Sequence, residues 1–508
     1  MSVRGAAQPP LSESHRAIAR GAGVNILGTI GKTLTPVFFI LVTRLYGPHD
    51  MGIFYLAFIL LDSLVTSLTV SGFNDGVLIY ASPWADNPER EEEFYRVLAN
   101  GLVITLLISG ALLALVHLGG LPLLLARYQQ PEIAESVRFM AWALPFVCIP
   151  IIVVAATKSL MIMKWDALVY GFFKPALLIA TTIGFRLLDA GLPGLWRSYV
   201  LTNIALTGIA LYVFQRHFCF RKLFRQIRHF RYFPALVRFA IPQNLNMTFN
   251  SFINNVDVMM LGFYGVSPEL IGFYGMGAQI VINLRQVRLV FSGAYAPVIS
   301  RLWAERDRDE INRSFSMVFR WTTTFALPLA LLIFVFRQDL LRLFHSSYTS
   351  DATFMILLLV PALLNCSIGL AGNLIAMTGH SLWNLANSIA IAGAGLVFNA
   401  LLIPRYGIMG AAGASALAGT SIYFLVLLEA RYVLGVTLIW KRVYKPLVAV
   451  VPALAITFVF ASQGIATHLA QRVVLALLNT LSFAAALAAL KLEPGDREAL
   501  FPWIKTGR

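Results

Sequence analysis

The stretch LVITLLISGALLALVHL, residues 102–118, contains no Asp, Glu, Lys or Arg. A helix that crosses the ~30 Å hydrocarbon core of a bilayer needs ~20 mostly apolar residues. A helix on the surface of a soluble protein would instead show a polar face at every turn. This stretch therefore predicts a transmembrane helix, and similar stretches recur along the chain.

The composition of the whole chain agrees. Of its 508 residues 58% are hydrophobic and 13% are charged, and its mean hydropathy is +0.73. Soluble domains carry about 25% charged residues, so this composition excludes a soluble enzyme, a disordered protein and a secreted disulfide scaffold. The three cysteines, Cys148, Cys219 and Cys366, are too scattered for a disulfide framework or a zinc site. We predict an all-α polytopic membrane protein.

Apolar windows of about 20 residues predict about fourteen transmembrane helices. They cover residues 22–44, 50–72, 96–117, 137–157, 165–187, 194–214, 237–262, 270–297, 314–336, 353–377, 381–403, 408–430, 443–462 and 469–490. The first is expected to be an uncleaved helix, because residues 1–21 are polar and the apolar stretch after them has full length.

Basic residues are unevenly divided between the two sides of this map. Segments on the side of the N-terminus hold 26 of the 40 Lys and Arg residues, the opposite loops hold 9 and the helices hold 5. Because basic loops stay in the cytoplasm, both termini are predicted to be cytoplasmic. The densest cluster consists of Arg216, Arg221, Lys222, Arg225, Arg228, Arg231 and Arg238, with no acid among them. We interpret it as a topology determinant that also contacts anionic headgroups, since nothing in it resembles a nucleic-acid-binding module.

A short pattern occurs twice. Tyr46-Gly47 is followed by Gly52, and Tyr264-Gly265 is followed by Gly272, at an offset close to 220 residues. Both copies stand at the same expected helix–helix connection. Two bundles related by duplication are a common transporter design, with the substrate held between them.

The duplication predicts the domain organisation. A cytoplasmic segment (1–21) precedes an N-lobe of six helices (22–214), a basic cytoplasmic linker (215–236) and a C-lobe of six helices (237–430). Two further helices (431–490) and a cytoplasmic tail (491–508) lie outside the repeat.

The helix expected at 237–262 carries an unusual polar row. Gln243, Asn246, Asn250, Asn254 and Asp257 are spaced by 3, 4, 4 and 3 residues, which places them on one helical face. Polar groups facing lipid would cost several kcal/mol each. The row is either a hydrogen-bonded seam between helices or the wall of a water-filled cavity, and its length of four turns favours the cavity.

Two other helices are expected to contribute to such a cavity. The first helix presents Asn25 and Lys32, and the helix at 270–297 presents Gln279, Asn283, Arg285 and Arg288. The two arginines are neighbours on one face and lie at mid-depth, which suits a di-anionic group such as a pyrophosphate. Alternatively, the two arginines form an ion pair with Asp62 or Asp257.

The balance of intramembrane charge indicates the nature of the cargo. Five bases, Lys32, Lys174, Arg285, Arg288 and Arg320, stand against Asp62 and Asp257, a net +3. We expect Lys32, Lys174, Arg285 and Arg288 to bind an anionic, hydroxyl-rich substrate, and the two acids to be candidates for ion coupling. Arg320 and Lys174 lie near helix ends, where snorkelling is an alternative. No nucleophile elbow, Walker motif or metal motif is present, so we expect a transporter without catalytic residues or cofactors.

Several motifs resemble one known family. Asn387, the run from Asn399 to Gly407 (NALLIPRYG) and Gly410-Ala411-Ala412 resemble the signature of polysaccharide-biosynthesis membrane proteins. Residues 43–48, 255–257 and 297–301 resemble further motifs of that family, so that the resemblance covers most of residues 20–430. The family is the oligosaccharide-flippase (Wzx-type) branch of the multidrug/oligosaccharidyl-lipid/polysaccharide transporter superfamily.

The resemblance implies two six-helix lobes that work by alternating access. Its members export undecaprenyl-pyrophosphate-linked oligosaccharides across the bacterial inner membrane, for surface polysaccharides such as O-antigen or for exopolysaccharide, beside polymerase or export machinery. The two extra helices resemble those of lipid II flippases and of some polysaccharide transporters, which leaves the subfamily open, with lipid II as an alternative substrate. A multidrug antiporter is a weaker alternative, because a cavity for cationic drugs should be acidic. Short outer loops count against a membrane glycosyltransferase or polymerase.

Overall fold

The computed structural model describes residues 34–84, 90–118, 128, 130–348, 351–378, 381–463 and 468–490. Within these ranges all regular elements are helical and no strand occurs. Ten helices are long and apolar enough to cross a membrane. A helix satisfies all its backbone hydrogen bonds internally, which is what an apolar chain in lipid requires.

The chain divides into two compact units. Unit 1 comprises the residues up to Asn255 together with Ser267–Gly272, and unit 2 comprises Val256–Val266 and the residues from Phe273 on. The boundary falls inside one helix, α13 (Pro234–Phe263).

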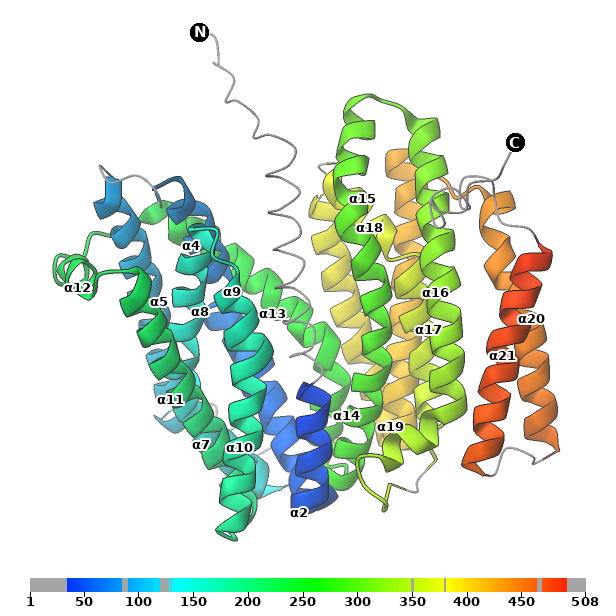
Figure 1. Cartoon of the computed structure of the whole chain (residues 1–508), viewed down its shortest axis with the longest axis horizontal. Coiled ribbons are helices and arrows are strands. Elements are labelled where there is room, and N and C mark those ends of the chain that lie inside the picture. The colour runs from blue at the N-terminus through cyan, green and yellow to red at the C-terminus, as the bar shows by residue number, and fades with distance from the viewer. Residues whose placement is uncertain are drawn as a thin grey trace. The chain divides into compact units, whose positions relative to one another are not determined.

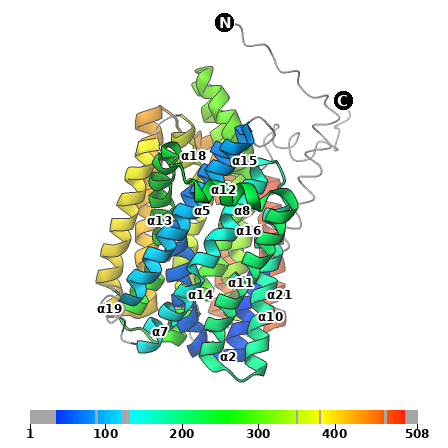
Figure 2. The ribbon, with the colours of Figure 1, turned by 90° about the vertical axis from the view of Figure 1, so that its left-hand side faces the viewer.

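Unit 1 contains the helices drawn from blue to green in Figure 1. They are α2 (Leu34–Phe58), η1 (Ile59–Val65), α3 (Thr66–Thr69), α4 (Ser71–Ala81), η2 (Ser82–Trp84), α5 (Glu91–Leu118), α7 (Pro131–Met140), η4 (Ala141–Ala143), α8 (Leu144–Ser159), α9 (Lys164–Asp166), η5 (Ala167–Phe173), α10 (Lys174–Leu187), α11 (Gly191–His217), α12 (Phe220–Arg228) and most of α13. Two of these, η1 and η5, are π-helical. Figure 2 shows α2, α10 and α11 side by side, in agreement with the contacts between them.

The first two expected helices form one kinked rod. It runs from Leu34 to Trp84, 51 residues, which is long enough to cross a membrane twice. The kink is at Gly47, whose φ of 89° favours glycine, and Pro48 begins the next turn, where its missing N–H is not needed. The part of the expected span 22–44 before Leu34 lies outside the described residues.

The second helix extends past the expected end at residue 72 and reaches Ala81. Its continuation is stabilised by α13, because the Gly72 N–H donates to Asn244 Oδ1 at 2.5 Å. A Cβ at Gly72 would lie 2.2 Å from the Ala240 carbonyl oxygen, so the two helices touch through their backbones. Close approach at small residues is a common way to pack helices in membranes.

Unit 2 contains the remaining helices. They are α14 (Pro268–Ile282, whose first residues belong to unit 1), η6 (Asn283–Arg285), α15 (Gln286–Ala304), α16 (Arg308–Arg342), α17 (Phe354–Ser367), α18 (Leu370–Met377), α19 (Ser381–Leu434), α20 (Trp440–Ser462) and α21 (Leu469–Ala489). The last two lie side by side (Figure 1). Helix α19 kinks at Gly407, φ 54°, between the spans expected at 381–403 and 408–430.

All fourteen expected spans overlap helices in the described ranges. Two of the ten apolar helices, Leu34–Trp84 and Ala386–Leu434, each overlap two expected spans. Helix α13 is not among the ten, since its row of amides lowers its hydropathy. The exact number of crossings, the domain limits and the cytoplasmic position of the termini stay predictions. The linker expected at 215–236 contains a helix of its own, α12.

Candidate functional site

Asp62 and Lys174 form an ion pair inside unit 1. The Lys174 ammonium lies 2.9 and 3.2 Å from the two carboxylate oxygens of Asp62, and the Tyr199 hydroxyl donates to the same carboxylate at 3.0 Å. Asp62 is part of the π-helical turn η1, and Lys174 follows directly on the π-helical η5. The wider turns of π-helices are frequent at functional sites. Lys174, expected among the substrate-binding cations, therefore has its charge met by Asp62.

Asp257 occupies a different environment in unit 2. Its side chain is 7% exposed and accepts hydrogen bonds from the Tyr274 hydroxyl at 2.5 Å, the Ser415 hydroxyl at 3.3 Å and the Val258 N–H at 2.9 Å. Within the described residues no Lys or Arg pairs with it. A buried carboxylate without a counter-cation is costly in its charged form. The role of Asp257 in ion coupling stays a prediction.

The polar row of α13 is only partly engaged by neighbouring helices. Gln243 donates to Asp75 of α4 at 3.2 Å. Asn250 and Asn254 are exposed, and their amides donate to the carbonyls of Asn246 and Asn250 one turn earlier in their own helix. That the row lines a cavity stays a prediction.

Arg288 of α15 is a partly buried base in unit 2. Its Nη1 donates to the Gly369 carbonyl at 3.3 Å, and its buried Nε has no hydrogen-bond partner. A Cβ at position 369 would lie 3.1 Å from Arg288 Cδ, so glycine gives the side chain its space. Among the described residues no carboxylate pairs with Arg288. Of the two acids named as alternative partners, Asp257 in unit 2 binds hydroxyls and Asp62 in unit 1 binds Lys174.

Polar groups surround this guanidinium. Asn365 donates to the Tyr423 hydroxyl at 2.5 Å, and Tyr423 and Arg285 are both electrostatic neighbours of Arg288. Arg285 itself belongs to η6, where the helix expected at 270–297 tightens before α15. Charge-assisted bonds to phosphate are the strong bonds that a guanidinium makes. The arrangement around Arg288 is suited to an anion with further hydrogen-bonding groups.

The other predicted site residues are distributed as follows. Asn25 and Lys32 lie outside the described residues. Asn283 is exposed and donates to the Gln279 carbonyl at 2.7 Å, and Arg320 is 5% exposed within α16. The described residues contain no group of His, Cys, Asp or Glu that could hold a metal ion.

Sequence reasoning missed several polar partners. Asp75 lies beyond residue 72, the expected end of the second helix. Tyr199, Tyr274 and Ser415 carry no charge to mark them in the sequence. Asn387, part of the family motif, donates to the buried Glu429 at 2.5 Å. Glu429 stands at the end of the span expected at 408–430, where a charged residue is not counted as intramembrane.

Comparisons with known proteins show which family and which solved structures the chain resembles. Residues 41–353 match the family described as polysaccharide biosynthesis protein. No curated protein matches the chain in sequence. The chain is similar in structure to the lipid II flippase MurJ in an inward closed conformation, with a TM-score of 0.70 at 14% identity over 94% of this chain and 99% of that one.

Multidrug transporters have a similar fold. An inward-facing multidrug resistance MATE family transporter of the MOP superfamily matches with a TM-score of 0.60 at 14% identity, over 80% of this chain and 95% of that one. The MATE multidrug transporter DinF-BH matches with a TM-score of 0.57 at 17% identity, over 82% of this chain and 96% of that one. The fold is that of membrane transporters.

Proposed function

The chain belongs to the polysaccharide biosynthesis protein family, and from that premise we propose that it is a flippase for polyprenyl-pyrophosphate-linked oligosaccharides. It would move these units by alternating access across the bacterial inner membrane, for surface or exopolysaccharide synthesis. Polymerase or export machinery on the far side would then use the units.

The observation on which this proposal rests is the set of contacts made by the Arg288 guanidinium. Its Nε is buried without a hydrogen-bond partner, and among the described residues no carboxylate pairs with it, so the guanidinium is available for an anion. A pyrophosphate has several oxygens, which can accept hydrogen bonds from the Arg288 guanidinium and from Arg285, one turn away. The exposed amides of Asn250 and Asn254 supply donors and acceptors for sugar hydroxyls.

The acids are assigned to coupling. Asp257 is the stronger candidate, because it has hydroxyl partners and no base. Asp62 is the weaker candidate, because Lys174 already neutralises it. Protonation or cation binding at Asp257 would change the charge of unit 2 without direct contact with the cargo.

A lipid II flippase is the second candidate. The similarity to MurJ extends over 94% of this chain and therefore reaches into its last helices. Lipid II and a polyprenyl-pyrophosphate oligosaccharide share the pyrophosphate and the lipid, so Arg288 fits both. The family match favours the oligosaccharide. A multidrug antiporter is disfavoured, because a cavity for cationic drugs should be acidic, whereas Arg288 is basic and has no acidic partner among the described residues.

Transport in proteoliposomes tests this proposal. The full chain is reconstituted with a polyprenyl-pyrophosphate oligosaccharide in one series and with lipid II in another, and a membrane-impermeant lectin or enzyme reports the units that reach the opposite leaflet. We expect rapid translocation of the oligosaccharide and little of lipid II. Translocation of lipid II alone would favour the second candidate, and transport of neither would overturn both.

A further inference from the structure

Helix α12 joins α11 to α13 in unit 1 and packs on the first turns of α5. One face of it is apolar: Phe220, Leu223 and Ile227 are spaced by 3 and 4 residues and contact the core of the unit. Leu223 is 5% exposed, and the Phe220 ring centroid lies 4.7 Å from that of Phe214 in α11. The Cys219 N–H, just before the helix, donates to the Tyr95 hydroxyl at 2.8 Å. Helix α12 is therefore a fixed part of unit 1.

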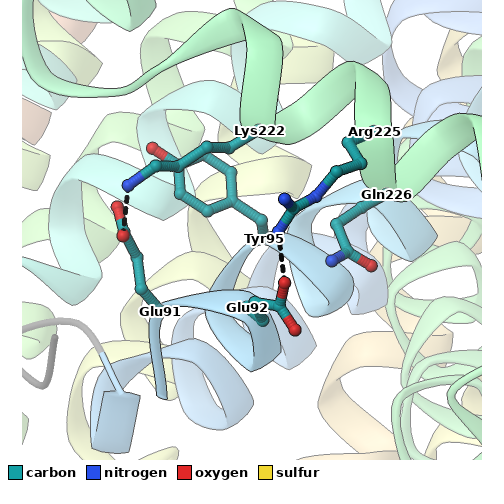
Figure 3. A pocket seen from close by; sticks show the side chains of 6 residues that line it. All are labelled: Glu91, Glu92, Tyr95, Lys222, Arg225 and Gln226. Atoms are coloured by element: carbon teal, nitrogen blue, oxygen red, sulfur yellow. Dashed lines mark hydrogen bonds and ion pairs between the residues drawn. The ribbon is translucent and has the colours of Figure 1, made fainter. Parts of the chain in front are cut away.

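Two of its basic residues are used within the unit. Lys222 pairs with Glu91, and Arg225 pairs with Glu92, both in the first turn of α5. Figure 3 shows these four side chains around a small pocket between the two helices. The two ion pairs fix α12 across the end of α5 and leave the helix's remaining basic residues for another role.

The face away from the core has an unusual composition. Arg221, Phe224 and Arg228, again spaced by 3 and 4 residues, form a row that we term the outer row. All three are exposed, and Phe224 is 63% exposed. Among the described residues neither arginine has an acidic partner. A large aromatic ring between two free guanidinium groups is unfavourable in water and favourable at a membrane surface, where the ring meets acyl chains and the charges meet phosphates.

The position of α12 agrees with this environment. It directly follows α11 and crosses the start of α5, and both of these helices are long and apolar enough to span a membrane. The outer row therefore lies at the level where spanning helices end. Two exposed aromatic residues, Phe230 and Tyr232, continue the surface toward α13. Aromatic residues are enriched at that depth.

We propose that the outer row of α12 is a docking surface for anionic phospholipids, with Arg221 and Arg228 on the headgroup phosphates and Phe224 at the acyl boundary. Charge complementarity selects anionic over zwitterionic lipid, because the row carries two positive charges and no acid. This role is independent of the transported cargo.

A native cysteine offers a direct measurement. Cys219 is exposed and adjoins α12, whereas Cys148 and Cys366, the other two cysteines of the chain, are buried. A fluorophore on Cys219 of the full chain in nanodiscs will report its neighbours through quenching by brominated lipid. We expect brominated phosphatidylglycerol to quench more strongly than brominated phosphatidylcholine at equal content, and high salt to reduce the difference.

Two double variants that remove the same charge distinguish lipid docking by the outer row from a general effect of the positive charge of α12. R221Q/R228Q should lose the preference for phosphatidylglycerol, by roughly fivefold in apparent affinity for each arginine, and should keep the wild-type Tm in phosphatidylcholine nanodiscs. K222Q/R225Q removes the same charge from the same helix and should keep the preference while losing thermal stability.

Three results would overturn the proposal: equal quenching by both lipids in the wild type, an unchanged preference in R221Q/R228Q, or a preference lost only in K222Q/R225Q. Binding of an acidic peptide that phosphatidylglycerol cannot displace would also overturn it, in favour of a protein partner.

Discussion

His49 Nδ1 lies 2.6 Å from Glu269 Oε1, and the two residues stand at equivalent positions of the internal repeat, 220 residues apart. Pro48 and Pro268 precede them at the same offset. The duplicated connections therefore pack against each other within unit 1. Glu132, at the start of α7, approaches the other ring nitrogen of His49 at 3.3 Å. One imidazole thus connects α2, α7 and the first turn of α14.

This contact predicts that the stability of the chain depends on pH and declines along two limbs, one at high pH and one at low pH. Burial lowers the pKa of His49, but the hydrogen bonds and charges of Glu269 and Glu132 outweigh it and raise the pKa above its ordinary 6.5. Burial raises the pKa of Glu269, while a backbone hydrogen bond and His49 together bring it below its ordinary 4.5. The His49 contribution is present below pH 6.5 and is lost as the pH rises through its raised pKa. The Glu269 contribution is present above pH 4.5 and is lost as the pH falls through its lowered pKa.

Thermal unfolding from pH 4 to 9 measures both limbs. Because these side chains are nearly half exposed, the effect should be about 1 kcal/mol or less. H49Q should remove the decline in stability at high pH. E269Q should weaken the declines at both high and low pH. An unchanged decline at high pH in H49Q would assign it to another group.

Gly52 packs tightly against the backbone of Pro268 in the second copy of the repeat. A Cβ there would lie 1.8 Å from the Pro268 carbonyl oxygen, so Gly52→Ala should force the backbones apart and destabilise the chain by about 1–3 kcal/mol. Gly110→Ala in α5 is the matched control, since nothing lies within 4 Å of its added methyl, and it should be neutral or slightly stabilising. Equal Tm values for the two variants would contradict the close packing.

The ion pair of Asp62 and Lys174 should behave as a coupled unit. Both side chains are mostly buried, with 17% and 24% exposure, so either single variant leaves the other charge uncompensated. We expect D62N and K174M each to cost roughly 1–3 kcal/mol and the double variant to cost less than their sum. Denaturation of the four proteins in the same detergent gives the coupling energy, and strictly additive losses would argue against the pair.

The apolar runs predict most of the helices, because only helices satisfy the backbone of such segments in lipid. The end of the second helix was not predictable in this way. Asn74 and Asp75 lower its hydropathy, and its extension depends on contacts with Ala240 and Asn244, far away in the sequence.

In the candidate site, too, the sequence predicts some features, while others depend on the tertiary structure. Periodicity places Asn250 and Asn254 on one face, and charge identifies Arg288. The partner of each charge depends on tertiary structure: Asp62 and Lys174 are 112 residues apart. The repeat likewise predicts that His49 and Glu269 are equivalent, while nothing in their spacing predicts that they touch.

Asn250→Leu distinguishes a cavity wall from a seam between helices. Among the described residues the exposed amide bonds to its own helix, so its loss should leave the free energy of unfolding within about 0.5 kcal/mol of wild type. Transport should fall, because a sugar would lose a hydrogen-bonding partner. Asn244→Leu is the comparison variant, since Asn244 is buried and accepts from Gly72, and it should destabilise the chain. A collapse of Asn250→Leu similar to that of Asn244→Leu would favour the seam.

Arg288→Ala tests the anion site most directly. Removing a guanidinium that carries the pyrophosphate should reduce transport about tenfold or more, the equivalent of one charge-assisted hydrogen bond. Arg288→Lys should restore part of the activity, because it keeps the charge and loses the planar fork. Stability should stay close to wild type, since the side chain makes one long hydrogen bond, to Gly369, and its Nε has no partner to lose. Transport of oligosaccharide and Tm are measured on the same preparations. Wild-type transport by a well-folded Arg288→Ala chain would remove Arg288 from the site and shift the anion site toward Arg285.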